Sequence, residues 1–413
     1  MKALLQILND VPEFQQLLAA LDGGRSPSAV SGLSPVHRAH FAAGLHRRMD
    51  CPVVMVCADE TEAHRLAEDL TAFTGEHVTL LAAREFLFHD GAVASRQWEH
   101  QRLAAFYDMS RDKTPLIVAT VEGLMQRTLS PEELAGHIVT VEQGGQYDLT
   151  ELADRLAALG YARCQQVEGV GQFALRGGIL DVYSPAQDHP VRIEFWDTDV
   201  DSMGLFDVDS QRRVARLEHA VFLPVSEVLP SRDGDGQWQR TPDRLLPTRY
   251  KHLTTAAHHL PAGAAVCFSE SGRVAERAKN WLWQLNEDVK ALIEAELIDG
   301  KHAVFAADLP ELMAILSDHP LCFLDAFATS STPLPPRALM SAQGRQLSSF
   351  GASLETAVSD LSQFQRSGAA TVVLVGSEQR ALNLQSLLRE QKIRSAVDFQ
   401  LHEMPQPGGV TIA

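Results

Sequence analysis

The chain has 413 residues, with 53 Asp and Glu against 36 Lys and Arg, and its formal net charge is −17. Because 45% of the residues are hydrophobic and 22% are charged, the composition is that of a globular protein and excludes disordered and fibrous classes. The acidity makes the chain alone a poor candidate for nucleic-acid binding, which needs clustered Lys and Arg. A protein partner or a small ligand is the better expectation.

No stretch of the chain has the pattern of a membrane span or a secretory signal. The longest apolar runs are far shorter than the roughly 20 residues that cross a bilayer, and residues 1–20 lack a basic start followed by a continuous apolar segment. The five cysteines are scattered and include no Cys-x-x-Cys pair, so we expect neither a disulfide scaffold nor a zinc ribbon. These observations favour a reducing cytoplasm and no membrane partner.

Residues 1–137 predict the first part of an α/β domain. Residues 1–25 have the leucine spacing of one amphipathic helix, and a Gly- and Ser-rich stretch at 23–33 leads to a further helical run. Strand and helix patterns then alternate: a strand at 52–58, a helix at 60–73, a strand at 78–82, a helix at 96–109 and a strand at 116–120. This alternation indicates a parallel sheet flanked by helices.

Residues 138–224 predict an inserted α+β domain. A short amphipathic helix is expected at 149–159. Short strand patterns, separated by turns rich in Pro and Asp, follow it: 165–167, 172–175, 178–183, 191–196 and 202–207. Such a succession is typical of an antiparallel meander.

The rest of the chain predicts a return to α/β structure. Residues 225–328, with a long helix at 273–297, are expected to form the second part of the α/β domain and to complete its sheet. Residues 329–346 contain three prolines and many small polar residues, the composition of a linker. Residues 347–413 predict a small third α/β domain. Because the apolar run at 410–413 has the pattern of a strand that stops abruptly, we expect a truncated fragment of a longer protein.

The turn Gly32, Leu33, Ser34 lies before a helix, where a P-loop ATPase carries its phosphate-binding loop. Such a loop needs Gly-x-x-x-x-Gly-Lys-Ser/Thr, because glycines let the backbone wrap the phosphates, the lysine supplies charge and the hydroxyl binds magnesium. Placing Gly32 and Ser34 on this pattern puts Leu33 at the lysine position and Pro27 at the first glycine, and Pro35 removes a further amide donor. We interpret this turn as a glycine turn before a helix, with no bound cofactor.

The sequence predicts neither a metal site nor catalytic residues. His37 and His40 have the spacing to share a helix face, yet no nearby residue completes a set of three or four metal ligands. The chain also lacks Gly-x-Ser-x-Gly and His-Glu-x-x-His motifs. A solvated helix face is therefore the interpretation of these histidines.

Residues 165–213 carry the strongest functional signal. Arg176 lies beside two glycines, and in the strand at 191–196 alternation places Arg192 and Trp196 on the face opposite the apolar side chains. Two arginines and a tryptophan on an otherwise acidic protein are typical of a hot spot for a protein partner.

The physical chemistry of these residues supports a purely structural interpretation as well as it supports a protein-binding surface. In that interpretation the surface is a salt-bridged sheet face on which Arg192 pairs with Asp181 or Glu194. Trp196 would then lie under a loop.

The same stretch resembles the module that UvrB shares with the transcription-repair coupling factor Mfd. It contains F-x-x-R-G-G-I-x-D-V-Y, then H-P-V-R-I-E-F, D-x-x-V-D-S and F-D-V-D-S-Q-R. The resemblance covers about residues 25–225 and extends more loosely to the end. It implies a UvrB-like parallel-sheet domain, related to P-loop NTPases but with a degenerate loop, and an inserted domain that docks the excision-repair protein UvrA. A linker and a small third α/β domain follow.

Two departures favour Mfd over UvrB. UvrB-like chains keep a working Lys-Ser/Thr loop and a tyrosine-rich hairpin that clamps DNA, whereas Leu33 replaces the lysine here and residues 86–98 contain no tyrosine. The resemblance therefore implies a non-enzymatic, UvrA-recruiting module of transcription-coupled nucleotide excision repair. In full-length Mfd relatives, an ATP- and Mg-dependent dsDNA translocase and an RNA-polymerase-binding domain lie further along the chain.

Transferred by motif, the UvrA-contacting residues are Arg176, Arg192 and Trp196. Relatives more often have another aromatic or an apolar residue at the tryptophan position. Two alternative functions remain open: an active UvrB-type damage-recognition ATPase, and an unrelated α/β nucleotide-binding enzyme. Stabilisation by magnesium-ATP would favour either alternative.

Overall fold

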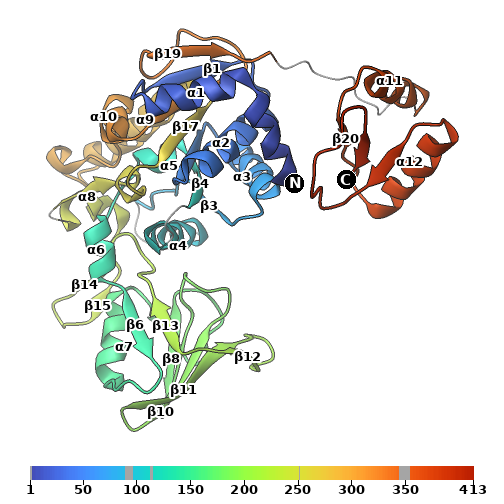
Figure 1. The fold of residues 1–413 in the computed structure, drawn as a ribbon. Helices are drawn as coiled ribbons and strands as arrows, with labels where there is room; N and C mark the ends of the chain where they lie inside the picture. Colours follow the sequence, from blue (N-terminus) through green and yellow to red (C-terminus); the bar gives the residue numbers. More distant parts are fainter. Residues whose placement is uncertain (1, 89–95, 112–114, 251, 344–353) are drawn as a thin grey trace.

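The computed structural model describes residues 2–88, 96–111, 115–250, 252–343 and 354–413. Most of the segment that replaces the UvrB hairpin, the end of the expected linker and the start of the expected third domain lie outside these residues. The described elements form an α/β body, an inserted module (residues 139–222) and a C-terminal body (residues 354–413), as Figure 1 shows. No helix in these ranges is long and apolar enough to cross a membrane.

A parallel seven-stranded sheet forms the centre of the α/β body. Its strands, in spatial order, are β19 (Ala338–Ser341), β1 (Ser28–Ser31), β18 (Leu321–Leu324), β17 (Ala265–Ser269), β2 (Val53–Cys57), β4 (Leu116–Thr120) and β3 (Val78–Leu81). Apolar side chains fill both faces: Val54 and Val56 pack into one core, and Val53, Met55 and Cys57 into the other. The continuous apolar runs of the sequence therefore predicted strands buried on both faces correctly.

Helices cover both faces of this sheet. One core contains η1 (Lys2–Asp10), α1 (Pro12–Asp22), α2 (Pro35–Met49) and α3 (Glu60–Thr74). The opposite core contains α4 (Gln97–Arg111), α5 (Val121–Met125), α6 (Pro131–Gly136), α8 (Leu246–Arg249), η3 (Ala256–His259), α9 (Ser271–Glu294), α10 (Leu309–Ile315) and η5 (Leu316–Asp318). Shorter elements join these helices: β5 (Arg127–Thr128) with β16 (Thr254–Thr255), β14 (Ser231–Arg232) with β15 (Trp238–Gln239), η2 (Asp243–Leu245) and η4 (Gly300–His302).

The amino-terminal region differs from the prediction of one helix over residues 1–25. A 3-10 helix ends at Asp10 and α1 begins at Pro12, because proline lacks an amide hydrogen and fits the first turn of a new helix. The predicted Gly- and Ser-rich turn also contains a strand. Ser28–Ser31 form β1 between β18 and β19, and Ser28 and Val30 are completely buried.

The segment expected to be a linker, residues 329–346, contributes an edge strand to the sheet. Within it, β19 pairs in parallel with β1, and Ser28 lies opposite Ala338. The amide of Arg337 donates to the carbonyl of Pro27, which extends the pairing by one hydrogen bond. Only four residues of this proline-rich segment form the strand, so the overall composition of the segment did not predict it.

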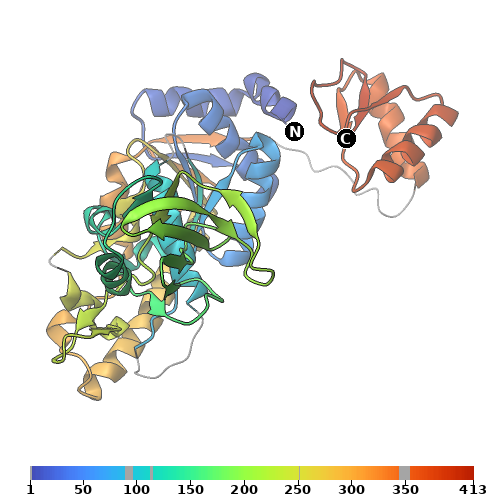
Figure 2. The same ribbon diagram turned by 90° about the horizontal axis from the view of Figure 1, so that it is seen from below.

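The inserted module has its own sheet and core. A six-stranded sheet contains, in spatial order, β12 (Arg213–Arg216), β11 (Asp199–Phe206), β10 (Val191–Trp196), β9 (Ile179–Val182), β8 (Gln172–Arg176) and β7 (Ala162–Arg163). Its inner face packs with α7 (Leu149–Ala158) and with the strand pair β6 (Val139–Glu142) and β13 (His219–Phe222). From β8 to β12 the neighbouring strands are antiparallel, as the meander pattern predicted. Figure 2 shows this green module in front of the larger body.

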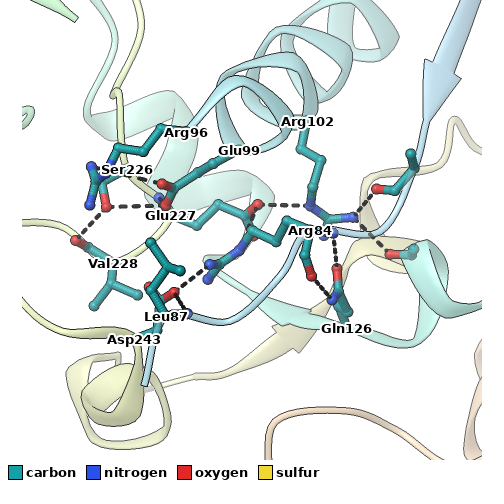
Figure 3. A network of polar contacts seen from close by, with 12 residues as sticks. Arg84, Leu87, Arg96, Glu99, Arg102, Gln126, Ser226, Glu227, Val228 and Asp243 are labelled. Atoms are coloured by element: carbon teal, nitrogen blue, oxygen red, sulfur yellow. Dashed lines mark hydrogen bonds and ion pairs between the residues drawn. The ribbon is translucent and has the colours of Figure 1, made fainter. Parts of the chain in front are cut away.

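A buried ionic network holds the chain where it returns from the inserted module (Figure 3). Glu227 accepts a hydrogen bond from Arg102 Nε at 2.7 Å and lies 3.2 Å from Arg84 Nε. Beside it, Glu99 accepts hydrogen bonds from Ser226 Oγ and from the amide of Glu227. Because loss of one partner would leave an uncompensated buried charge, these pairs fix the return segment on the α/β body.

The C-terminal body contains a parallel three-stranded sheet with two helices. Its elements are α11 (Leu354–Arg366), β20 (Thr371–Val373), α12 (Glu378–Glu390), β21 (Ser395–Val397) and β22 (Val410–Ile412), and β22 lies between the other two strands. Leu361, Leu388 and Ile412 form part of a separate core. The run at 410–413, predicted to be a strand, is therefore the central strand of this sheet.

Candidate partner-binding surface

Two short hairpins lie at one end of the sheet in the inserted module. Gly177 and Gly178 join β8 to β9, and Asp197 and Thr198 join β10 to β11. Gly177 and Asp197 have φ angles of 60° and 56°, the left-handed conformation that such two-residue turns need. A Cβ atom on Gly178 would lie 2.8 Å from the carbonyl oxygen of Phe195, so glycine is required there too. Because β9 and β10 are antiparallel, both turns lie at the same end of the sheet.

Arg176 and Arg192 converge on the carboxylate of Asp181. Arg176 Nη2 donates to Asp181 Oδ2 at 2.9 Å, and Arg192 donates from Nε and Nη2 to the two carboxylate oxygens at 2.7 and 2.8 Å. Asp181 is 1% exposed, whereas the side chains of Arg176 and Arg192 are 51% and 21% exposed. One buried carboxylate therefore orients two guanidinium groups on the outer face of the sheet.

Arg192 is held on three sides. Besides its pair with Asp181, its Nη2 donates to Gln211 Oε1 at 2.8 Å, and its guanidinium carbon lies 4.2 Å from the centre of the Phe206 ring. The hydrogen bond with Asp181 raises the pKa of Arg192, so this side chain stays charged. These contacts leave little rotational freedom to the guanidinium group.

Trp196 projects from the last position of β10 and is 81% exposed. Alternation along β10 places it on the same outer face as Arg192 and Glu194. The structural interpretation of this surface is thus half right: the pair between Arg192 and Asp181 is present, but Trp196 does not lie under a loop. We call Arg176, Arg192 and Trp196 the arginine–tryptophan surface.

Further arginines lie on β12, which pairs with β11 at the edge of the sheet. In β12, an edge strand, all four residues are exposed, including Arg213 and Arg216. Arg213 Nη2 donates to Ser202 Oγ at 3.1 Å and lies 3.7 Å from Glu194. Arg213 and Arg216 therefore add positive charge to this side of the module, where Arg213 is paired with Glu194.

The sequence did not predict that Asp181 orients both arginines. It indicated Asp181 only as one of two possible partners of Arg192. The strand register could have predicted this role. With a two-residue turn at Gly177 and Gly178, Asp181 lies on β9, between β8 and β10, and directly opposite Arg192. Register across three strands depends on turn lengths that one sequence leaves open.

The turn at Gly32 lies between β1 and α2 at the carboxyl edge of the large sheet. Gly32 has a φ angle of 86°, and a Cβ atom there would lie 2.0 Å from the carbonyl oxygen of Ala342. The amide of Gly32 donates to the carbonyl of Ala326, and the amide of Leu33 donates to the carbonyl of Asp325. The Leu33 side chain is buried, at 2% exposed. The amides of Gly32 and Leu33 are thus already bonded to carbonyl groups of the chain.

Comparison with known proteins relates the chain to one family. Residues 139–227 match the family described as the UvrB interaction domain. A transcription-repair-coupling factor from Bacillus subtilis is 23% identical over 434 residues, which cover 94% of this chain and 36% of that protein. The chain is similar to transcription-repair-coupling factors over most of its length.

Other relatives with the same name support this relationship. The factor from Myxococcus xanthus is 34% identical over 224 residues, covering 52% of this chain and 19% of that protein. The factor from Escherichia coli is 28% identical over 253 residues, covering 60% and 21%. The chain therefore spans well under half the length of the curated relatives it matches. The whole arginine–tryptophan surface lies inside the segment that matches the UvrB interaction domain.

Proposed function

We propose that this chain is the amino-terminal, UvrA-recruiting part of a transcription-repair coupling factor. Such a factor links stalled RNA polymerase to nucleotide excision repair. The observation that carries this proposal is the pair Arg176 and Arg192 on one buried carboxylate beside an exposed Trp196. These residues lie within the match to the UvrB interaction domain.

The geometry of this surface suits an acidic partner. Arg176 and Arg192 carry two positive charges and Asp181 carries one negative charge, so the group keeps a net charge of about +1. Because guanidinium groups can bind carboxylates through two parallel hydrogen bonds, arginine gives both affinity and orientation. The contacts of Arg192 with Asp181 and Gln211 hold it in place before binding, which lowers the entropy lost on association. Trp196 offers an apolar ring that a partner can cover.

In this proposal the residues of the fragment bind no nucleotide at the Gly32 turn and hydrolyse no ATP. Two observations support this: the amides of Gly32 and Leu33 are bonded to carbonyl groups of the chain, and the side chain of Leu33 is buried. The motif comparison predicts that Leu33 stands at the position of the phosphate-binding lysine. The ATP- and Mg-dependent translocation of dsDNA and the binding of RNA polymerase are assigned to other parts of such factors. An ATP hydrolysis rate above the protein-free blank would instead favour a UvrB-type ATPase.

The test is direct binding of the chain to purified UvrA by calorimetry. We expect the wild type to bind and Arg176→Ala, Arg192→Ala and Trp196→Ala to bind more weakly, each central arginine contributing about 2 kcal/mol, roughly thirtyfold in Kd. The matched control is Arg380→Ala, which removes an exposed arginine of α12 in the C-terminal body. If the wild type fails to bind, or if the control weakens binding as much as the surface variants, the proposal is wrong.

A further inference from the structure

A second basic site lies in a cleft of about 810 Å³ between the inserted module and the α/β body. On the module side it is lined by α7, β7 and the start of β8, and on the other side by the start of α4 and by the segment that returns from the module to β15. It is separate from the arginine–tryptophan surface. Gln172 begins β8 and Arg176 ends it, and Arg163 of β7 pairs beside the beginning of β8, so Arg163 lies at the other end of β8 from Arg176.

Three arginines line this cleft: Arg96, Arg163 and Arg240. The side chains of Arg163 and Arg240 are exposed and form no hydrogen bond or ion pair with any described residue. Arg96 Nη1 lies 3.8 Å from Glu99, and its Nη2 atom is buried without a hydrogen-bond partner in the described part of the chain. Burial lowers the pKa of Arg96, the negative charges of Glu99 and Asp243 act in the opposite direction, and the positive charge of Arg240 lowers it. Arg96 thus has Glu99 as its ionic partner, whereas the side chains of Arg163 and Arg240 have none among the described residues.

The other titratable groups that line the cleft do not neutralise these arginines. Asp154 is the acidic side chain among the described lining residues, and both of its oxygens accept hydrogen bonds from Arg232 Nη2 at 2.8 Å. Asp154 Oδ1 also accepts a hydrogen bond from Trp238 Nε1. Burial lowers the pKa of His100 to about 4, so its ring is neutral at pH 7. Among the described lining residues, arginines therefore outnumber carboxylates, on a chain whose net charge is −17.

We infer that this cleft binds a small oxyanion with at least two negative charges, of the phosphate-ester or pyrophosphate class. Guanidinium groups suit such a ligand because they offer paired N–H donors to two oxygens of one phosphate group. A cleft of this volume lies in the range of roughly 300 to 1,000 Å³ that small-molecule sites occupy. Arg163 lines the cleft from the module, and Arg96 and Arg240 line it from the body, so an anion that contacts both sides would hold the two bodies in one arrangement.

Calorimetric titration of the whole chain with inorganic pyrophosphate tests this inference. We expect binding to the wild type that weakens as salt is raised, and a loss of roughly tenfold for each of Arg163→Gln and Arg240→Gln. The matched control is Arg380→Gln, which makes the same charge change in the C-terminal body and is expected to leave the Kd unchanged. Circular dichroism of each variant checks that it is folded.

Three outcomes would overturn the inference. The first is no pyrophosphate binding by the wild type at low salt, and the second is equal weakening by Arg163→Gln and Arg380→Gln, which would show unspecific attraction. The third is tight binding of a polyglutamate peptide, sensitive to Arg163→Gln, without pyrophosphate binding, which would assign the cleft to an acidic protein segment. None of these results depends on UvrA binding, because Arg163 and Arg240 are not part of the arginine–tryptophan surface.

Discussion

At the scale of single residues, Asp181 decides how the arginine–tryptophan surface is presented. Its carboxylate is buried beneath two arginines and accepts three hydrogen bonds from them. A charged group in this position is stabilised only because both guanidinium groups contact it. The aspartate therefore couples the stability of the module to the geometry of its outer face.

We expect Asp181→Asn to lower the free energy of unfolding by about 1 to 3 kcal/mol, because the amide replaces a charged acceptor and turns a donor group towards the arginines. Urea unfolding monitored by circular dichroism measures this change. The control is Asp201→Asn, an exposed position in β11 where we expect a change below about 0.5 kcal/mol. Equal effects of the two substitutions would show that the buried carboxylate contributes nothing specific.

At the scale of elements, the edge strand β19 completes the α/β body. It covers the outer edge of β1, and its Met340 side chain is buried in the same core as Val30. A chain that ends at residue 328 leaves the hydrogen-bonding groups on the β19 side of β1 unpaired, whereas a chain that ends at residue 343 keeps β19. Unpaired strand edges promote association with other chains.

We expect the chain that ends at residue 328 to lose roughly 2 to 4 kcal/mol of unfolding free energy relative to the chain that ends at 343, since it loses several backbone hydrogen bonds of about 1 kcal/mol each. Differential scanning calorimetry gives the stability, and light scattering reports aggregation. The chain that ends at residue 343 is the matched control, because both shortened chains lack the C-terminal body. Identical melting temperatures would mean that residues 329–343 behave as the linker that their composition indicated.

Short and irregular elements are where the sequence and the structure differ. The runs that became β2 and β4 were predictable, because continuous apolar residues have few alternatives to a strand buried on both faces. β1 and β19 have four residues each and contain serine, so their local preference for a strand is weak. They form strands because β1 pairs with β18 and β19 pairs with β1. In the module, alternation placed Arg192 and Trp196 on one face, but the strand register that joins Arg176 to Asp181 is a tertiary property.

At the scale of the whole molecule, two opposite effects of pH act on stability. The net charge of −17 causes self-repulsion that decreases as the pH falls toward the isoelectric point of about 5.4. Against this, burial lowers the pKa values of His259 and His100 to about 4. The His259 ring is stacked on Phe106 with 4.0 Å between ring centres, and its Nε2 lies 2.9 Å from the carbonyl oxygen of Leu129. Protonation of either ring therefore costs stability.

The sign of the histidine contribution follows from the two states. In the unfolded chain these rings titrate near pH 6.5, and in the folded chain near pH 4, so the unfolded state binds more protons between these values. The stability is complete above pH 6.5 and is lost as the pH falls toward 4. At pH 5 each histidine accounts for a loss of about 2 kcal/mol. Salt screens repulsion between exposed charges, so we expect the buried histidines to dominate at physiological salt.

We therefore expect the free energy of unfolding to decrease between pH 7 and pH 5, and His259→Gln to reduce this decrease by about 2 kcal/mol, because glutamine stays neutral. Urea unfolding at pH 7, 6 and 5 in 0.15 M salt measures both quantities. The control is His64→Gln, an exposed position in α3 where we expect the pH dependence of the wild type. A wild-type stability that rises toward pH 5 would show that relief of charge repulsion outweighs the buried histidines.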